Sequence, residues 1–522
     1  MRAMREGHSL HWLRQRGAGM LLHPTALPGD QGVGTLGKEA LRFLDFLKAA
    51  GMTHWQICPL GPTGYGDSPY QCFSAFAGNP YLIDLDDLTE RGLLLPEEIE
   101  PLRGLSKGQV DFGGLYEKKG PVLEIAFQRF KRAGAPELAD DLSYERFKAV
   151  NQHWLVPYAL FRAIKDEQGG KPWPEWPQEL RHYPSVLHSE ARRRLAEACD
   201  AHSFHQYAFF VQWRRIREQA ALRGVDIIGD LPIFVAGDSA DVWANPDLFD
   251  LDPDSGQPRH VAGVPPDYFS ADGQLWGNPL YLWDRHRDSG FHWWHLRLEG
   301  AFKLYDIVRI DHFRGFDAYW EVPYPATNAR EGRWVSAPGA EFFRAVSSRF
   351  PEARIIAEDL GLLSESVVDL RERTGLPGME VLQFAFGGRS DNFYLPHNHQ
   401  QNAVVYAGTH DNDTSLGWYG TAEEKIKDHA RRYLRVDGRE IGWDLIRAAY
   451  GSVSRLAIVT LPDVLSLGSE ARFNTPGQPN GNWQWRYQPD QLTRAFERSA
   501  AYLKELAILN GREPRSEETE AG

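Results

Sequence analysis

The sequence predicts an α/β fold, a parallel (β/α)8 TIM barrel with large, mostly helical insertions between its strands. Eight short apolar segments, many of them rich in β-branched residues, are distributed along the 522 residues, and helical patterns lie between most of them. Ionisable side chains stand at the carboxyl ends of several apolar segments, where such barrels carry their functional groups. A doubly wound parallel sheet is the alternative that the same alternation allows.

The expected strands are continuous apolar runs, which is typical of parallel strands that are buried on both faces. Helices with apolar residues at helical spacing are expected at 38–50, 203–223 and 364–374, and each of them is followed by a glycine. The expected strands are 18–23, 53–60, 225–234, 305–313, 354–360, 380–386, 403–409 and 455–461.

We expect residues 1–522 to form one elaborated barrel domain. About 160 residues separate the second and third expected strands, which indicates an inserted, mainly helical subdomain at about 84–202. Further insertions are expected at about 320–350 and 412–453. The segment 263–281, GVPPDYFSADGQLWGNPLY, has four aromatic rings and no regular periodicity. We expect it to be a loop that either packs down or closes over a site as a lid.

Composition excludes several classes of partner. The formal net charge of −13 and the lack of Lys/Arg clusters argue against nucleic acid and anionic membranes. We expect no signal peptide and no membrane span, because the required apolar runs are missing. Three cysteines without a CxxC motif favour a reducing, cytoplasmic location. No obligate protein partner is evident, and no HExxH-type spacing indicates a metal.

Aromatic residues are unusually numerous, with 17 Trp, 20 Tyr and 27 Phe. Most are expected to lie in the core, but many occur in loop sequence rich in proline and glycine. We interpret these loop rings, such as Trp173, Trp176, Trp276, Trp483 and Trp485, as exposed. Exposed rings suit stacking on a neutral polyhydroxylated ligand, and a sugar is therefore the expected ligand.

Three expected strands end in carboxylic acids. Asp311 follows the apolar part of the segment LYDIVRIDHFRG, and Glu358 follows the apolar part of ARIIAEDLG. Asp411 comes directly after NAVVYAGTH. Unpaired charges at the end of a buried strand are costly, so these positions suit a functional cleft better than a structural role. Three carboxylates from three strand ends are typical of a carboxylate-driven hydrolase or transferase.

Strand geometry suggests different roles for two of these acids. Side chains at i and i+2 share a face, so Arg309 is expected beside Asp311, where its charge favours the ionised carboxylate of a nucleophile. Glu358 has Ile356 and Leu360 on its own face, and an apolar setting favours the protonated form of a general acid. A structural Arg309–Asp311 ion pair remains the alternative.

Two further acids have polar surroundings. Asp411 follows a Gly–Thr pair and is expected to stay ionised and to bind sugar hydroxyls. Asp230 ends the third expected strand in IIGDLP, where a structural role and a binding role are equally consistent with the pattern.

The motifs LLHPTALPG, PLGPTGYGDSPYQ, GDLPIFV, GVPPDYFS, WGNPLY, RIDHFRG, AEDLG and GTHDN, spread over about 21–486, resemble those of one enzyme family. The chain is similar to the amylomaltases, or disproportionating enzymes, which are 4-alpha-glucanotransferases of glycoside hydrolase family 77 in the alpha-amylase superfamily. The resemblance implies transfer of α-1,4-glucan segments to glucose or glucan acceptors by a retaining double displacement, without metal or cofactor. Expected donors are maltooligosaccharides, amylose and glycogen.

The resemblance also implies residue roles. Asp311 matches the nucleophile, Glu358 the acid/base and Asp411 the transition-state stabiliser. Sequence alone leaves open an α-1,4-glucan hydrolase on the same scaffold and a non-catalytic glucan-binding protein. The implied substrate-binding residues are Tyr70, Asp230, Arg309 and His410 in the donor subsite, Tyr268, Phe269 and Trp276 in a loop over the substrate, Asn474 on a facing loop, and Tyr65 and Tyr116 in a second glucan site.

Overall fold

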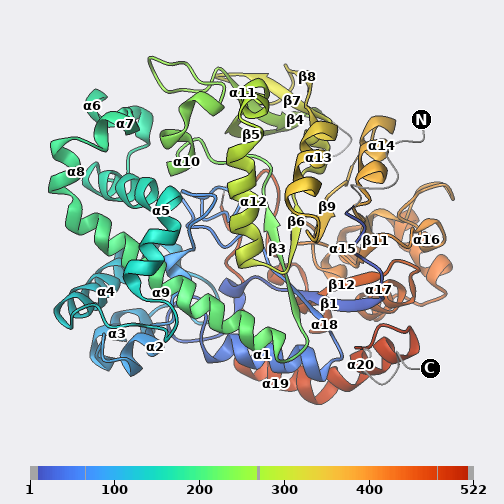
Figure 1. The fold of residues 1–522 in the computed structure, drawn as a ribbon. Helices are drawn as coiled ribbons and strands as arrows, with labels where there is room; N and C mark the ends of the chain where they lie inside the picture. The colour runs from blue at the N-terminus through green and yellow to red at the C-terminus, as the bar shows by residue number, and fades with distance from the viewer. Residues whose placement is uncertain (1–9, 65, 267–270, 362, 479, 515–522) are drawn as a thin grey trace.

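A computed structural model describes residues 10–64, 66–266, 271–361, 363–478 and 480–514 (Figure 1). Its centre is an eight-stranded parallel sheet in the order β10-β11-β12-β1-β2-β3-β6-β9. The strands are β1 (Gly17–Leu21), β2 (His54–Gln56), β3 (Asp226–Leu231), β6 (Ile307–Ile310), β9 (Ile355–Ala357), β10 (Gly378–Val381), β11 (Ala403–Tyr406) and β12 (Leu456–Thr460).

The two end strands of this sheet, β9 and β10, lie next to each other. The Ala357 N–H donates to the carbonyl of Pro377, immediately before β10, at 2.9 Å. The sheet is therefore a nearly closed barrel, which confirms the predicted (β/α)8 fold. The doubly wound alternative is wrong, because the two ends of such a sheet stay apart as open edges.

All eight predicted strands occur, but the boundaries differ most at β10. The predicted strand was 380–386, whereas β10 starts at Gly378 and gives way to the 3₁₀ helix η6 (Leu382–Phe384). Leu382, Ala385 and Phe386 are buried in a separate hydrophobic cluster. A continuous apolar run cannot distinguish a strand from a 3₁₀ turn that packs into the core.

Helices surround the barrel and cover the apolar outer faces of its strands. Helix α14 ends at Gly375, whose φ of 76° is the left-handed conformation that favours glycine at a helix end. These helices, with those that extend the loops, are α1 (Lys38–Ala49), α10 (Ala240–Ala244), α11 (Trp283–Asp288), α12 (His292–Leu304), α13 (Gly339–Arg349), α14 (Glu365–Thr374), α15 (Ser415–Thr421), α16 (Glu424–Leu434), α17 (Ile441–Gly451), α18 (Leu461–Val464), α19 (Pro489–Arg498) and α20 (Ala500–Leu509).

The residues between β2 and β3 are mainly helical and form the left side of the molecule in Figure 1. Their apolar side chains, such as Phe127 and Phe161, belong to the same hydrophobic cluster as the barrel strands. A separate subdomain at about 84–202 stays a prediction. The helices here are α2 (Leu85–Glu90), α3 (Pro96–Arg103), α4 (Phe112–Arg132), α5 (Tyr144–Glu167), α6 (Gln178–Arg181), α7 (Tyr183–Val186), α8 (Glu190–Arg194) and α9 (Ala196–Ala221).

Helix α9 starts seven residues before the predicted start at Ser203. The hydroxyl of Ser203 donates to the Cys199 carbonyl at 2.8 Å. Ser203 therefore lies inside the helix and bonds to the preceding turn instead of capping it. A serine before an amphipathic run in the sequence is compatible both with a cap at the start of a helix and with a position inside the helix.

A second, antiparallel sheet lies over one rim of the barrel, at the top of Figure 1. The predicted loop 263–281 is therefore partly wrong: β5 pairs with β4 although its sequence shows no alternation. Residues 267–270 within it lie outside the described part. The sheet has the order β5-β4-β7-β8, with β4 (His260–Val264), β5 (Gln274–Pro279), β7 (Ala318–Pro323) and β8 (Arg333–Ser336).

Within the described residues, no helix is both long and apolar enough to cross a membrane.

Candidate active site

The three acids singled out by the sequence stand at one end of the barrel. Asp311 directly follows β6, Glu358 directly follows β9, and Asp411 lies in the loop after β11. The Glu358 Oε2 atom accepts a hydrogen bond from the His312 N–H at 2.6 Å, and the Glu358 N–H donates to the Ile310 carbonyl at 3.0 Å. The Glu358 carboxyl group therefore lies against the peptide that follows Asp311.

Arg309 links two carboxylates on neighbouring strands. Its Nη1 atom donates to Asp230 Oδ2 at 2.5 Å and to Asp311 Oδ1 at 3.2 Å, and its Nε atom contacts Met379 Sδ at 3.3 Å. The expected i, i+2 neighbourhood of Arg309 and Asp311 is present. Arg309 is only 3% exposed and the Asp311 side chain is 26% exposed, so the guanidinium forms the floor and Asp311 faces the opening.

A hydrogen-bonded chain connects Asp230 to Asp411. The Tyr70 hydroxyl donates to Asp230 Oδ2 at 2.7 Å and accepts from His410 Nε2 at 2.8 Å. His410 Nε2 also lies 3.4 Å from Asp411 Oδ2. The Tyr70 and His410 rings are stacked, with centroids 5.2 Å apart and planes 20° from parallel. These contacts fix the positions of both rings beside the acids.

The other oxygen of Asp411 is held from the facing loop. The Asn474 side-chain amide donates to Asp411 Oδ1 at 2.7 Å. Arg472 donates from Nη2 to the Asp411 carbonyl and from Nε to the Asn474 carbonyl, both at 2.7 Å. The loop 472–474 therefore positions both the backbone and the carboxylate of Asp411.

These contacts give Asp411 a low pKa. Desolvation acts to raise the pKa of Asp411, but the His410 charge and hydrogen bonds from His410 and Asn474 outweigh it and hold that pKa well below its usual range. The pKa of His410 is raised because Asp411 favours its charged form against desolvation. Asp411 is an anion, as its polar sequence context predicted.

Asp311 and Glu358 have raised pKa values. Desolvation is the largest cause in both, and Arg309 acts in the opposite direction. The charges of Asp230, Glu358 and Asp411 also act on Asp311, so that its pKa rises to about 8. Hydrogen bonds from the N–H groups of His312 and Leu360 stabilise ionised Glu358, but desolvation prevails.

The pKa of Asp311 is therefore shifted in the direction opposite to the one expected from Arg309 alone. Arg309 lies closer to Asp230 than to Asp311, so its charge is shared between two carboxylates. The spacing in the sequence predicted the contact between Arg309 and Asp311. It could not show that Asp230, on the neighbouring strand, also binds Arg309. The predicted rise in the pKa of Glu358 agrees with the structure, and its cause is desolvation.

The remaining predicted residues are only partly described. Trp276, on β5, lies with its ring edge-on to the His312 ring, at a centroid distance of 4.7 Å and an angle of 86°. Tyr116 lies on α4 and is 69% exposed, and no contact among the described residues joins it to the three acids. Tyr65, Tyr268 and Phe269 lie outside the described residues.

Two further rings lie near His410, and sequence reasoning missed the first of them, His23. His23 follows β1, and burial with the nearby charge of His410 lowers its pKa to about 3; an ionisable residue directly after an apolar strand was the available signal. Trp483 lies with its ring centroid 5.8 Å from that of His410. The interpretation of Trp173, Trp176 and Trp483 as exposed is wrong, because all three are buried.

Within the described ranges, no group of three or more His, Cys, Asp or Glu side chains is arranged to hold a metal ion.

Comparison with known proteins gives consistent similarities. A family model described as 4-alpha-glucanotransferase matches residues 22–493. The chain is 52% identical over 486 residues to the 4-alpha-glucanotransferase of Thermus thermophilus, covering 92% of this chain and 96% of the relative. It is 46% identical over 498 residues to that of Synechocystis sp., covering 95% and 98%. A solved amylomaltase from Streptococcus agalactiae in complex with acarbose superposes with a TM-score of 0.90 at 40% identity, covering 96% of this chain and 100% of that one.

Proposed function

The chain belongs to the 4-alpha-glucanotransferase family, and we propose that it transfers segments of α-1,4-glucans to glucose or glucan acceptors by a retaining double displacement. Family membership confirms the resemblance carried by the sequence motifs. The observation that carries the mechanism is the convergence of Asp311, Glu358 and Asp411 at one barrel rim, with Asp411 ionised and a proton available to the other two.

In the first step, Asp311 attacks the anomeric carbon of the donor. A bond forms between a carboxylate oxygen and that carbon while the glycosidic bond breaks, and the departing 4-oxygen takes the proton of Glu358. In the second step, Glu358 removes the proton of an acceptor 4-hydroxyl, whose oxygen displaces Asp311. The pKa values of both carboxyl groups are raised, and the attack requires that Asp311 is ionised and that Glu358 carries the proton.

Asp411 supplies electrostatic stabilisation. The Asp411 carboxylate is kept ionised and oriented by His410 and Asn474, and a fixed anion stabilises the positive charge that develops on the sugar ring. Tyr70, Asp230 and His410 present hydrogen-bonding groups for the donor sugar. Trp276, Tyr268 and Phe269 are proposed to cover the site, so that an acceptor sugar competes with water.

Further features of the proposal rest on the sequence. Tyr65 and Tyr116 form a second glucan site, and neither a metal nor a cofactor takes part. The three free cysteines and the lack of a membrane-spanning helix in the described residues support a cytoplasmic location. Donors are maltooligosaccharides, amylose and glycogen.

Incubation with maltotriose tests the activity. A ladder of longer and shorter glucans with a constant number of reducing ends is the expected result. A rise in reducing ends that accounts for all substrate consumed would identify a hydrolase, and unchanged maltotriose would leave only a glucan-binding protein. Either result would overturn the proposal.

A further inference from the structure

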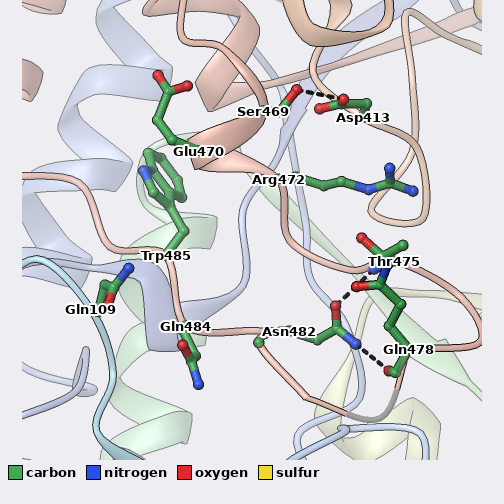
Figure 2. A pocket seen from close by; sticks show the side chains of 11 residues that line it. Gln109, Asp413, Ser469, Glu470, Arg472, Thr475, Gln478, Asn482, Gln484 and Trp485 are labelled. Carbon is green, nitrogen blue, oxygen red and sulfur yellow. Dashed lines mark hydrogen bonds between the residues drawn. The ribbon is translucent and has the colours of Figure 1, made fainter. Parts of the chain in front are cut away.

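A polar pocket of about 300 Å³ lies beside the candidate active site (Figure 2). Residues of the segments 469–478 and 481–485 line one wall, and Gln109 and Asp413 contribute the others. Its volume is at the small end of the roughly 300–1,000 Å³ of ligand pockets in proteins. Trp485, one of the loop rings that the sequence indicated for sugar stacking, lines it, whereas none of the residues expected in the donor subsite does.

Internal hydrogen bonds hold the walls of this pocket in shape. The Asn482 side chain accepts from the Thr475 N–H at 2.9 Å and donates to the Gln478 carbonyl at 2.7 Å. Across the pocket, Asp413 Oδ2 accepts from the Ser469 hydroxyl at 2.7 Å. Figure 2 shows these contacts along the two sides of the opening. The pocket is therefore largely preformed, which lowers the cost of ordering it around a ligand.

The lining favours a neutral polyhydroxylated ligand. Two carboxylates, Asp413 and Glu470, and one guanidinium, that of Arg472, belong to the lining, so its net charge disfavours anions. The side-chain amides around them both donate and accept hydrogen bonds, as sugar hydroxyls do. Trp485 supplies a flat apolar surface and is supported edge-on by Phe473, at a centroid distance of 5.6 Å.

Arg472 joins this pocket to the candidate active site. Its side chain lines the pocket, and the same guanidinium group binds the backbone carbonyls of Asp411 and Asn474. Asp413, on the other wall, is two residues from Asp411. The two sites therefore share one wall, and a polymer held at the acids can extend into the pocket.

We propose that this pocket binds a glucosyl segment of an α-1,4-glucan at a position removed from the bond that is cleaved. The inference rests on the proposed function for the identity of the sugar. It predicts that long glucans gain affinity from the pocket, whereas maltotriose, which is too short to occupy both places, does not.

The kinetic test uses the full-length double variant Gln109→Ala/Gln478→Ala. Both side chains are exposed at the pocket rim, and Trp485 is left in place because it packs on Phe473. We expect KM for short-chain amylose to rise at least fivefold, with kcat/KM for maltotriose within twofold of wild type. Gln401→Ala, an equally exposed glutamine before β11 at the other end of the barrel, is the matched control and should change neither value.

The structural test uses crystals of Asp311→Asn soaked with maltoheptaose. Sugar density against Trp485 supports the inference. An empty pocket in crystals whose active site is occupied, or an amylose KM in the double variant within twofold of wild type, overturns it. The maltotriose ladder of the wild-type enzyme separates these failures from failure of the proposed function, because that assay does not involve the pocket.

Discussion

The hydrogen bond from Asn474 to Asp411 is the contact whose catalytic value can be measured most directly. In Asn474→Ala, Asp411 Oδ1 loses a donor at 2.7 Å, while the Asn474 N–H to His410 carbonyl bond is retained by the backbone. A hydrogen bond to a charged group contributes about 1.5–3 kcal/mol. If this contribution is realised in the transition state, kcat/KM for maltotriose falls roughly 10- to 150-fold.

The same substitution should raise the pKa of Asp411, because one of the contacts that lower it is lost. Protonation then removes the anion at a higher pH, so activity at the acidic end should decline earlier than in wild type. Asn474→Asp places a second anion beside Asp411. It should therefore lower kcat/KM further and raise the pKa of Asp411 further than Asn474→Ala does. The assay is the initial rate of glucose release from maltotriose between pH 4 and pH 8.

Asn402→Ala is the control, because that amide donates to the Gly375 carbonyl before β10, away from the acids. Its kcat/KM should stay at the wild-type value. If Asn474→Ala keeps kcat/KM within threefold of wild type and an unchanged acidic limb, the role assigned to the Asn474–Asp411 contact is refuted.

Three other predictions concern the nucleophile, the cover of the site and stability. Asp311→Asn should retain the fold, as judged by circular dichroism, and have less than a tenth of wild-type transfer; more activity would exclude Asp311 as nucleophile. Tyr268→Ala/Phe269→Ala should raise the ratio of hydrolysis to transfer, measured as reducing ends per glucose released, and an unchanged ratio would contradict a covering role. Burial lowers the pKa of His205 to about 3, so between the unfolded value of about 6.5 and 3 only the unfolded chain takes up this proton, and stability is lost as pH falls. Relative to His205→Gln, wild type should therefore lose about 2 kcal/mol of unfolding free energy between pH 7.5 and pH 5 in urea titrations, and a difference that does not depend on pH would contradict this.

The barrel could be predicted because burial on both faces makes its strands continuous apolar runs. Every one of the eight runs overlaps a barrel strand, and the acids at 311, 358 and 411 meet because parallel strands end at the same rim. The antiparallel sheet was not predictable in the same way. Strand β5, QLWGNP, depends on pairing with β4, which in turn pairs with β7, and its own sequence carries no period of two.

Electrostatics was predicted less well than position. The i, i+2 rule brought Arg309 to Asp311, but the pKa of Asp311 is raised first by desolvation and also by charges such as that of Asp230, which comes from a strand about 80 residues earlier. Likewise, the Trp176 ring packs against Phe161 and Trp243, and the Trp173 ring donates from Nε1 to the Gly237 carbonyl. Loop composition rich in proline indicated irregular backbone, which says nothing about what the rings pack against.

The pairing of β1 with β12 has a consequence for biosynthesis. Strand β1 is the first of the barrel strands to leave the ribosome, but one of its two neighbours, Leu456–Thr460, is translated more than 400 residues later, and Asn474 later still. During elongation the growing sheet therefore presents unpaired apolar edges that invite aggregation or chaperone capture. Messages truncated upstream of this strand would yield products with no route to a closed, active molecule.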